Sequence, residues 1–464
     1  MIKVYNTLSR KKEELRPLND KKINLFVCGP TVYDYSHLGH ARTYIAFDMI
    51  AKYLRYSGFD VFYLQNITDV DDKIIKRAEE NKISAKDLAE KFEKEYMQDM
   101  ESLGVDSATK YARATDHITE IISQIKRLLE KRFAYDISDG IYYDISKFKD
   151  YGKLSGRTAL QAEDSQSRID EGINKKNKGD FCLWKRSKPN EPSWNSPWGE
   201  GRPGWHIEDT AITEKYFGSN YDIHGGARDL IFPHHEAEIA QMEAISEKVP
   251  LVKYWIHTGF LTISNEKMSK SLGNFITIKD FLSNNKEGKR LLRFFILRAH
   301  YHSPLDYNEK TAAGLKNELL RIDEFILKLE DLAKGNKKAT SNKLSEKITK
   351  GVKKAMEDDF NTPVAISVIF ETITEANSLI AKDKLSNAEA NTILKTLKEL
   401  DSFFGFVFPG RKEDIPAEIL TLASQREKYR QQKEWQKADE IRRKVEELGY
   451  QIKDTKEGPK IKKI

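Results

Sequence analysis

The stretch Ile23-Asn24-Leu25-Phe26-Val27-Cys28-Gly29-Pro30 decides the fold of this chain. Its first six residues are mostly apolar and predict a short buried strand, which Gly29-Pro30 ends. A helical pattern follows, in which apolar residues recur at spacings of three and four: Tyr44, Phe47, Ala51 and Leu54. Asp60 to Leu64 then predicts a second strand. Because strand, helix and strand in this order make a βαβ unit, the sequence predicts a parallel, Rossmann-type sheet with functional residues at the strand ends.

Changes in composition divide the rest of the chain. Charged helical stretches run from about Ser84 to Lys131, and a polar segment rich in Gly, Pro and Trp extends from about 175 to 203, as an inserted connective segment would. After about Thr311 a stripe of apolar residues predicts helices: Leu315, Leu319, Ile322, Ile326 and Leu329. Gly335 to Asn342 breaks this pattern, Pro409 to Pro416 is a candidate linker, and a helical stretch around Ser424 to Leu448 precedes a Lys-rich, strand-like tail. We therefore expect an α/β domain at 1–310, with an insertion at about 115–203, a helical bundle at 311–408 and a small module at 409–464.

The composition is that of a globular protein. The 464 residues are 39% hydrophobic and 32% charged, and no apolar run approaches the ~18 residues that a membrane span needs. The N-terminus lacks the apolar core of a signal peptide, and the only cysteines are Cys28 and Cys182, so we expect a cytoplasmic protein without a disulfide framework. Residues 411–464 contain 15 Lys and Arg against 11 Asp and Glu, a net charge of +4 out of +6 for the chain. This module could contact a phosphate backbone, although a solvated helical surface explains the charge equally well.

Two short motifs indicate the chemistry. His37-Leu38-Gly39-His40 follows the first strand, and its imidazoles could donate to the phosphate oxygens of a nucleotide, while Gly39 leaves room for a base or ribose. Alone, this tetrapeptide fits a pair of surface histidines without a role better than a nucleotide site. Lys267-Met268-Ser269-Lys270-Ser271, over 200 residues later, places two lysines where both can reach a triphosphate and a leaving pyrophosphate. Together with the βαβ unit, the two motifs indicate nucleotidyl transfer.

Both motifs resemble the signatures of class I aminoacyl-tRNA synthetases, and the surrounding sequence is similar to the cysteine-specific family among them. The further stretches that match follow in family order: 27–34, 66–73, 197–199, 204–208, 222–226, 232–236, 358–363 and 438–442. The resemblance covers essentially the whole chain. It implies a class I catalytic domain at 1–310 with a loop region for the second motif at about 256–310, then a helical bundle and a C-terminal anticodon-binding module. It also implies an enzyme that activates L-cysteine with ATP and transfers it to tRNA(Cys).

The resemblance further implies one zinc ion (Zn2+) per chain, which the family holds with two cysteines, a histidine and a glutamate. Cys28, His234 and Glu238 stand at three of these positions, but Asp209 stands where the family has the second cysteine. We expect Asp209 to be the fourth ligand or a close outer partner. If Pro233 begins a helix, His234 and Glu238 lie on one helical face. The alternatives are a buried Cys28 with no metal and a protein that selects cysteine by shape alone.

The same resemblance implies roles for other residues. The nucleotide contacts would come from His37, Gly39, His40, His224, Gly225, Lys267 and Lys270, and the catalytic groups among them would be His37, His40, Lys267 and Lys270. The cysteine pocket would be formed by Thr68, Trp205 and Asp229. Cys182 is expected to be structural, and His206 fits a structural and a functional role equally well. Mg2+ would accompany ATP, and the protein is expected to be a monomer without membrane contact.

Two other functions share parts of this pattern. Ligases that join cysteine to an amino sugar have the same catalytic core but should lack a full anticodon-binding end. A catalytically silent tRNA-binding paralogue is the second alternative, and the departure at Asp209 keeps it open. More than 150 residues follow the second motif, including the basic module, and both motifs are intact. These features favour the tRNA ligase.

Overall fold

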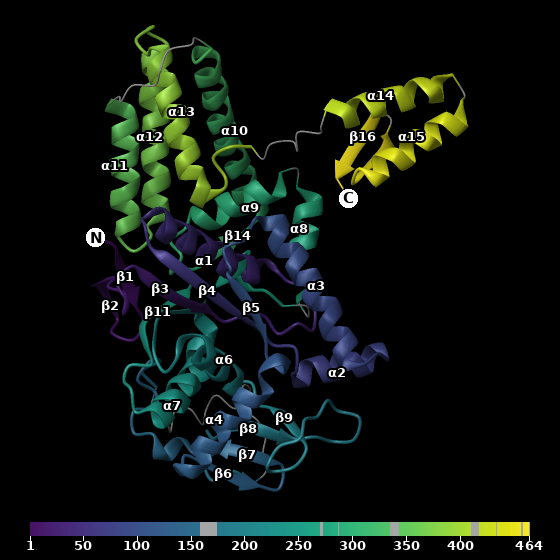
Figure 1. The fold of residues 1–464 in the computed structure, drawn as a ribbon. Helices are drawn as coiled ribbons and strands as arrows, with labels where there is room; N and C mark the ends of the chain where they lie inside the picture. Colours follow the sequence, from purple (N-terminus) through teal and green to yellow (C-terminus); the bar gives the residue numbers. More distant parts are fainter. Residues whose placement is uncertain are drawn as a thin grey trace. The chain divides into compact units, whose positions relative to one another are not determined.

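A parallel sheet of five strands carries the functional residues (Figure 1). Its order is β11–β10–β3–β4–β5, and every neighbouring pair is parallel. The strands are β3 (Lys22–Val27), β4 (Asp60–Ile67), β5 (Lys110–Arg113), β10 (Tyr221–Ala227) and β11 (Val252–Thr258). Helix α1 (Leu38–Tyr56) connects β3 to β4, which confirms the predicted βαβ unit and the Rossmann-type fold class.

The computed structural model describes residues 1–157, 174–269, 272–285, 287–334, 343–409, 417–432, 434–455 and 458–463. The chain forms two compact units, Met1–Phe408 and Pro409–Ile464. The predicted helix break at 335–342 and nearly all of the predicted linker lie outside the described residues. None of the described helices is both long enough and apolar enough to cross a membrane.

Helix α1 is buried over most of its length because it lies between the sheet and further helices. Tyr44, Phe47, Ala51 and Leu54 are all buried, as their spacing predicts. A side chain at Gly225 of β10 would place its Cβ 2.4 Å from the ring of Phe47. Glycine at this position therefore allows α1 to pack directly on the sheet. This packing fixes the start of α1 at the carboxyl ends of the strands.

The segment between β4 and β10 contains more strands than its sequence suggests. The helices there are α2 (Asp72–Asn81), α3 (Ala85–Leu103), α4 (Ile118–Glu130) and α6 (Ile207–Phe217), with short turns at Thr115–His117 and Ile145–Lys147. Edge strand β5 interrupts the predicted helical stretch between α3 and α4. An antiparallel sheet is formed by β6 (Ala134–Ile137), β7 (Gly140–Tyr143), β8 (Phe181–Arg186) and β9 (Gly201–Pro203). Two of its strands lie in the segment that was expected to be only a polar connection.

After the parallel sheet, the chain forms small strands and then a helical bundle. The small elements are β12 (Leu261–Ile263), β13 (Glu266–Lys267), α8 (Ile278–Asn284), α9 (Gly288–Leu297) and β14 (Leu305–Tyr307). Helix α7 (Glu236–Ser246) comes earlier, between β10 and β11 of the parallel sheet. The bundle consists of α10 (Glu309–Leu332), α11 (Lys343–Glu357), α12 (Thr362–Ile380) and α13 (Asn387–Phe404). The predicted apolar stripe of α10, from Leu315 to Leu329, is buried. At the N-terminus, β1 (Lys3–Asn6) and β2 (Lys11–Glu14) pair as an antiparallel hairpin.

The second unit has a small core of its own. Its elements are α14 (Ala417–Gln431), α15 (Trp435–Glu447) and the antiparallel hairpin of β15 (Tyr450–Thr455) and β16 (Gly458–Lys463). The helical stretch expected around Ser424 to Leu448 is thus two helices. The core residues of the unit come from both helices and the hairpin: Ile419, Leu422, Ala423, Val445 and Ile452.

Candidate active site and metal centre

Residues that follow three neighbouring strands line a cavity of about 410 Å³. Cys28 follows β3, Asp229 follows β10 and Gly259 follows β11. These are the carboxyl ends of parallel strands, where ligands bind in open α/β sheets. The predicted site residues that line the cavity are Cys28, His37, Gly39, His40, Trp205, Asp229 and Lys267.

The first motif forms the N-terminal cap of α1. The backbone N–H of Gly39 donates to Nδ1 of His37 at 3.0 Å, and the N–H of His37 donates to Nδ1 of His40 at 3.3 Å. Because both Nδ1 atoms accept, each ring carries its proton on Nε2. Burial and the neighbouring His37 lower the pKa of His40 well below its ordinary value. Both imidazoles are therefore suited to donate from Nε2 as neutral groups.

Gly39 lines the cavity and also makes room for this cap. A Cβ at Gly39 would lie 2.7 Å from Cε1 of His37, so a larger residue would displace the histidine ring, and the predicted contact of Gly39 with a nucleotide stays a prediction. The rings of His37 and His40 stack with their centroids 4.0 Å apart. Glycine at this position permits the histidine geometry.

The second motif borders the same cavity. Lys267 is the last residue of β13, and both Lys267 and Met268 line the cavity. The N–H of Ser269, the residue after Met268, donates to Oδ1 of Asn274 at 2.8 Å, and this hydrogen bond holds the backbone of Ser269 in place. Lys270 lies outside the described residues.

Three of the predicted contact residues lie behind the cavity instead of on its wall. Thr68 is buried and donates to Oε1 of Glu208 at 2.7 Å. The hydroxyl of Tyr221 is 2.7 Å from Nδ1 of the fully buried His224. Gly225 faces the ring of Phe47. The predicted roles of Thr68, His224 and Gly225 in binding substrates stay predictions.

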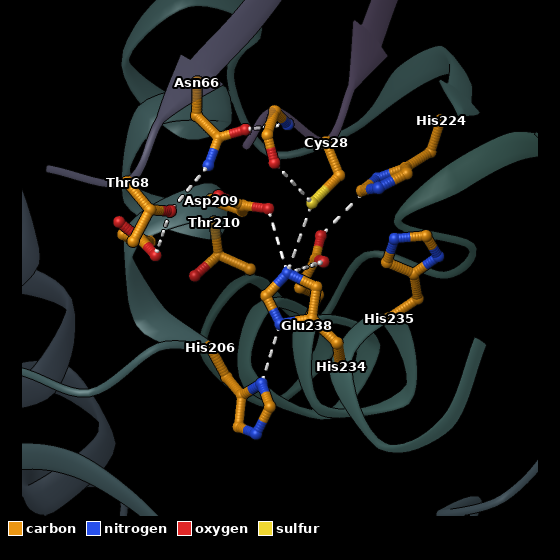
Figure 2. Close-up of polar contacts among 12 residues, drawn as sticks. Cys28, Asn66, Thr68, His206, Asp209, Thr210, His224, His234, His235 and Glu238 are labelled. Carbon is orange, nitrogen blue, oxygen red and sulfur yellow. Dashed lines mark hydrogen bonds and ion pairs between the residues drawn. The ribbon is translucent and has the colours of Figure 1, made fainter. Parts of the chain in front are cut away.

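Three of the four predicted metal ligands, Cys28, Asp209 and His234, place their ligand atoms within 4.8 Å of one another, and Glu238 contacts His234. Figure 2 shows Cys28, Asp209 and Glu238 directed toward the ring of His234. Nε2 of His234 lies 3.7 Å from Sγ of Cys28, 3.1 Å from Oδ2 of Asp209 and 3.4 Å from Oε1 of Glu238. These residues come from the end of β3, from α6 and from the region where α7 begins. The aspartate is therefore long enough to reach His234 and to lie within 4.8 Å of the sulfur of Cys28.

The chemistry of this donor set fits a divalent cation. Oδ1 of Asp209 and both carboxylate oxygens of Glu238 are buried and have no hydrogen-bond partner among the described residues. Burial, Asp209 and Glu208 raise the pKa of Glu238 well above its ordinary value. Burial, followed by Asp209 and Glu238, likewise raises the pKa of the Cys28 thiol. Two carboxylates and a thiol at such a distance need a positive charge before all of them can ionise.

His234 is oriented by two neighbours. Its Nδ1 lies 2.8 Å from Nδ1 of His206, and the ring of Trp205 stacks on it at a centroid distance of 4.2 Å. When Nε2 binds a metal ion, Nδ1 of His234 would carry the proton and donate to His206, so this contact would select that tautomer. Burial and His234 lower the pKa of His206, which suits a neutral acceptor. The sequence left the role of His206 open, and the structure shows that its ring contacts His234.

The local structure around the metal ligands agrees with the predicted helical face. Phe232 is extended, so a kink separates Ile231 from the helical residues that start at Pro233 and continue into α7. The ring of His234 lies within 3.4 Å of Glu238, four residues later. The predicted shared face therefore exists.

A second group of buried ligand-type side chains adjoins the first. Its ligand atoms, from His224, His235 and Glu238, lie within 4.8 Å of one another. Glu238 connects this group to the first through its contact with His234. Oε2 of Glu238 is 3.5 Å from Nδ1 of His224, and Nδ1 of His235 is 2.8 Å from Nε2 of His257. Sequence reasoning missed His235 and His257, although His235 is adjacent to a predicted ligand.

Comparison with known proteins places these observations in a family. Residues 14–317 match the model for the tRNA synthetases class I (C) catalytic domain, 351–408 match the DALR domain, and 412–459 match the cysteinyl-tRNA ligase anticodon binding domain. A cysteine–tRNA ligase of Thermococcus onnurineus is 46% identical over 479 residues, covering 100% of this chain and 99% of the relative. One from Pyrococcus abyssi is 47% identical, covering 98% and 97%, and one from Carboxydothermus hydrogenoformans is 43% identical, covering 100% of both.

A solved structure shares the fold at low sequence identity. Mycobacterium tuberculosis methionyl-tRNA synthetase in complex with methionyl-adenylate matches with a TM-score of 0.65 and 16% identity, covering 85% of this chain and 92% of that one. At this identity the likeness concerns the fold alone.

Proposed function

The chain belongs to the cysteine–tRNA ligase family of class I aminoacyl-tRNA synthetases, and we propose that it selects cysteine through a zinc ion held by Cys28, Asp209, His234 and Glu238. As a member of this family, it is an enzyme of protein synthesis whose substrates are ATP, an amino acid and tRNA. The observation that supports the zinc site best is the convergence of three donor groups on Nε2 of His234, at 3.1 to 3.7 Å. When bound, the ion would supply a Lewis acid that prefers a thiolate to the hydroxyl of serine, which shape alone separates poorly.

Asp209 changes the character of this site. Its hard oxygen replaces a soft thiolate, while the formal charge of the ligand set stays the same. Zinc should therefore be held less tightly than by two thiolates. His206 and Trp205 compensate in part, because they hold the ring of His234 in one orientation.

The amino acid would occupy the part of the cavity beside Trp205. Asp229 follows β10 and lines the same cavity, where its carboxylate would meet the substrate ammonium. Thr68 would act from behind, through its hydrogen bond to Glu208. The carboxylate of cysteine is then left to attack the α-phosphate of ATP.

The nucleotide would lie over the start of α1. His37 and His40 donate from Nε2 to phosphate oxygens, while Lys267 and Lys270 stabilise the charge of the leaving pyrophosphate. His224 and Gly225 are assigned to the adenosine end, and Mg2+ would accompany the triphosphate. The reaction needs little acid–base chemistry from side chains, since positioning and charge stabilisation suffice.

The C-terminal module would read the anticodon of tRNA(Cys). It has a net charge of +4, and Trp435, at the start of α15, exposes 58% of its surface. A cationic surface that presents an aromatic ring is suited to phosphates and unstacked bases. Sequence reasoning did not single out Trp435. We assign catalysis to 1–310, the helical bundle to 311–408 and anticodon reading to 409–464.

We further propose that the enzyme works as a monomer in the cytoplasm, where translation takes place. Charging assays test the function directly: the protein should form cysteinyl adenylate and transfer cysteine to tRNA(Cys). Adenylate formation with transfer to an amino sugar and not to tRNA would identify the other ligase class. Binding of tRNA without adenylate formation would identify a silent paralogue.

A further inference from the structure

Lys73 is a cation at the rim of the catalytic cavity for which the mechanism above has no use. It is exposed, it lies in the first turn of α2, and it lines the cavity. Its Nζ is 5.6 Å from the centroid of the Tyr33 ring and 5.9 Å from that of Trp205. Because Trp205 stacks on His234, Lys73 lies at the cysteine end of the cavity.

The neighbouring carboxylates are committed to other partners. Asp72 pairs with Arg202 at 2.5 Å and with Lys185 at 2.9 Å. Oδ1 of Asp71 caps α2 by accepting from the backbone N–H of Lys73 at 2.8 Å. Among the residues that the structure describes, no carboxylate oxygen lies within 4.0 Å of Nζ of Lys73. The ammonium therefore keeps its charge available to a ligand.

Helix stability does not explain the lysine. A cation in the first turn of a helix opposes the macrodipole and costs a few tenths of a kcal/mol or more. The two aromatic rings hold the ammonium by weak cation–π attraction, which a stronger anionic partner can replace. Both features point to a ligand that arrives at this side of the cavity.

The anions of the reaction can be assigned in turn. The phosphates of ATP, including the α-phosphate that stays in the adenylate, are assigned above to His37, His40, Lys267 and Lys270. The cysteine carboxylate must stay reactive. The remaining anion is the backbone of the acceptor end of tRNA, which must enter through the mouth of the cavity. A positive charge next to an aromatic ring, as in Lys73 and Tyr33, is the usual combination for binding single-stranded nucleic acid.

We propose that Lys73 binds a backbone phosphate in the acceptor end of tRNA and so positions the terminal adenosine for transfer. In that step a ribose hydroxyl oxygen bonds to the carbonyl carbon of the adenylate. The bond from this carbon to the phosphate oxygen breaks, AMP leaves with the electron pair, and the hydroxyl proton passes to the released phosphate or to water. Lys73 is thus a positioning residue that touches no reacting atom.

This inference rests on the proposed function and is tested by separating the two half-reactions. Lys73→Ala is compared with Lys73→Arg and with Lys76→Ala, a control at an exposed lysine of the same helix that does not line the cavity. Cysteine-dependent exchange of pyrophosphate into ATP, measured without tRNA, should stay within about twofold of the parent. Transfer from preformed adenylate should show a kcat/KM for tRNA about tenfold lower, the effect of about 1.4 kcal/mol.

Salt dependence supplies a second readout that a purely structural role would not change. In a plot of log kcat/KM for tRNA against log salt, Lys73→Ala should reduce the slope by about 0.7, the value for one phosphate of a single strand. Lys73→Arg should restore most of the transfer rate, and Lys76→Ala should match the parent.

Three results would overturn the proposal. An exchange rate that falls as far as the transfer rate would assign Lys73 to ATP or cysteine. Transfer equal to that of the parent would show that Lys73 has no part in either step. A parent enzyme that forms adenylate but never charges tRNA would refute the proposed function itself, and this inference with it.

Discussion

At the scale of single residues, the site depends on contacts between positions that are far apart in the sequence. Cys28 and His234 are separated by 206 positions, yet their Sγ and Nε2 atoms lie 3.7 Å apart. Asp209, which the resemblance to the family sets at the position of its second cysteine, lies 3.1 Å from His234. The substitution keeps the negative charge of the ligand set and changes only its softness.

Asp209 should therefore control how long zinc stays bound. Asp209→Cys introduces a softer ligand and should slow the release of zinc to a colorimetric chelator. Asp209→Ala removes the ligand and should speed release at least tenfold, by analogy with the loss of partners that orient a metal site. Release rates that are equal in all three proteins would show that Asp209 does not interact with the ion.

The lysines of the second motif should act on chemistry more than on binding. Lys270→Ala is expected to leave cysteine binding nearly intact and to slow adenylate formation by ~10²–10³, the typical cost of losing one positioned charge donor. Pyrophosphate exchange reports this step, and Lys248→Ala, at an exposed lysine outside the cavity, serves as the control. Exchange within a few-fold of the parent would disprove this assignment.

Spacing could predict only part of the site. The pair His234 and Glu238 could be predicted because residues four apart share a helical face. The contact between His206 and His234 could not, since it depends on how the start of α6 meets the turn before α7. The contact between Gly39 and the ring of His37 could not be predicted for a similar reason, because the tetrapeptide alone does not show how that ring is placed.

At the scale of helices and strands, long periodic elements were predictable and short ones were not. The strands around α1 and the apolar stripe of α10 follow from spacing that repeats over many residues. Strands β5 and β9 have four and three residues, too few for a pattern, and they form because neighbouring strands pair with them. Between helices, buried charged side chains help to fix how the helices pack.

One such contact joins α1 to α9. Nη2 of Arg293 lies 2.9 Å from Oδ2 of Asp48, both side chains are almost fully buried, and Lys52 also contacts Asp48 at 2.9 Å. Nε of Arg293 donates to the carbonyl of Phe404 at 3.0 Å, so the same side chain also contacts the end of α13. Burial alone would raise the pKa of Asp48, but Arg293 and Lys52 outweigh it and lower the pKa. The stabilising contribution of this carboxylate is present at neutral pH and is lost as pH falls through the lowered pKa.

Arg293→Met should therefore destabilise the first unit. Removing one partner of a buried pair costs ~3–5 kcal/mol when the other charge is left without compensation. Because Lys52 still contacts Asp48 at 2.9 Å, the loss here should lie at or below the lower end of this range. Arg298→Met is the matched control, since Arg298 is 37% exposed and its pair with Glu318 should contribute less than ~1 kcal/mol. Urea unfolding monitored by fluorescence gives both values. Equal losses in the two variants would contradict the importance assigned to the buried pair.

At the scale of the whole molecule, the features for catalysis and those proposed for tRNA binding belong to different units. The cavity and the metal ligands belong to Met1–Phe408, while Pro409–Ile464 has its own core and most of the net positive charge. Composition could predict that a separate basic module ends the chain. It could not predict the helical hairpin of α14 and α15, because no strong breaker marks the turn between them.

Removal of residues 409–464 should leave adenylate formation intact and weaken charging. The shortened enzyme should show normal pyrophosphate exchange, a raised KM for tRNA and a smaller dependence of tRNA binding on salt. Titrations at several salt concentrations measure the last effect. Normal charging of tRNA by the shortened enzyme would refute the assignment of anticodon reading to this module.

The metal content of the intact protein tests the central claim most directly. The protein is purified without chelator, its zinc is measured by elemental analysis, and charging activity is assayed on the same sample. We predict about one zinc per chain, because the buried ligand atoms of Cys28, Asp209 and His234 lie together and Glu238 contacts His234. A zinc content below about a tenth of an equivalent, too low for a working site, together with full charging activity would contradict the account.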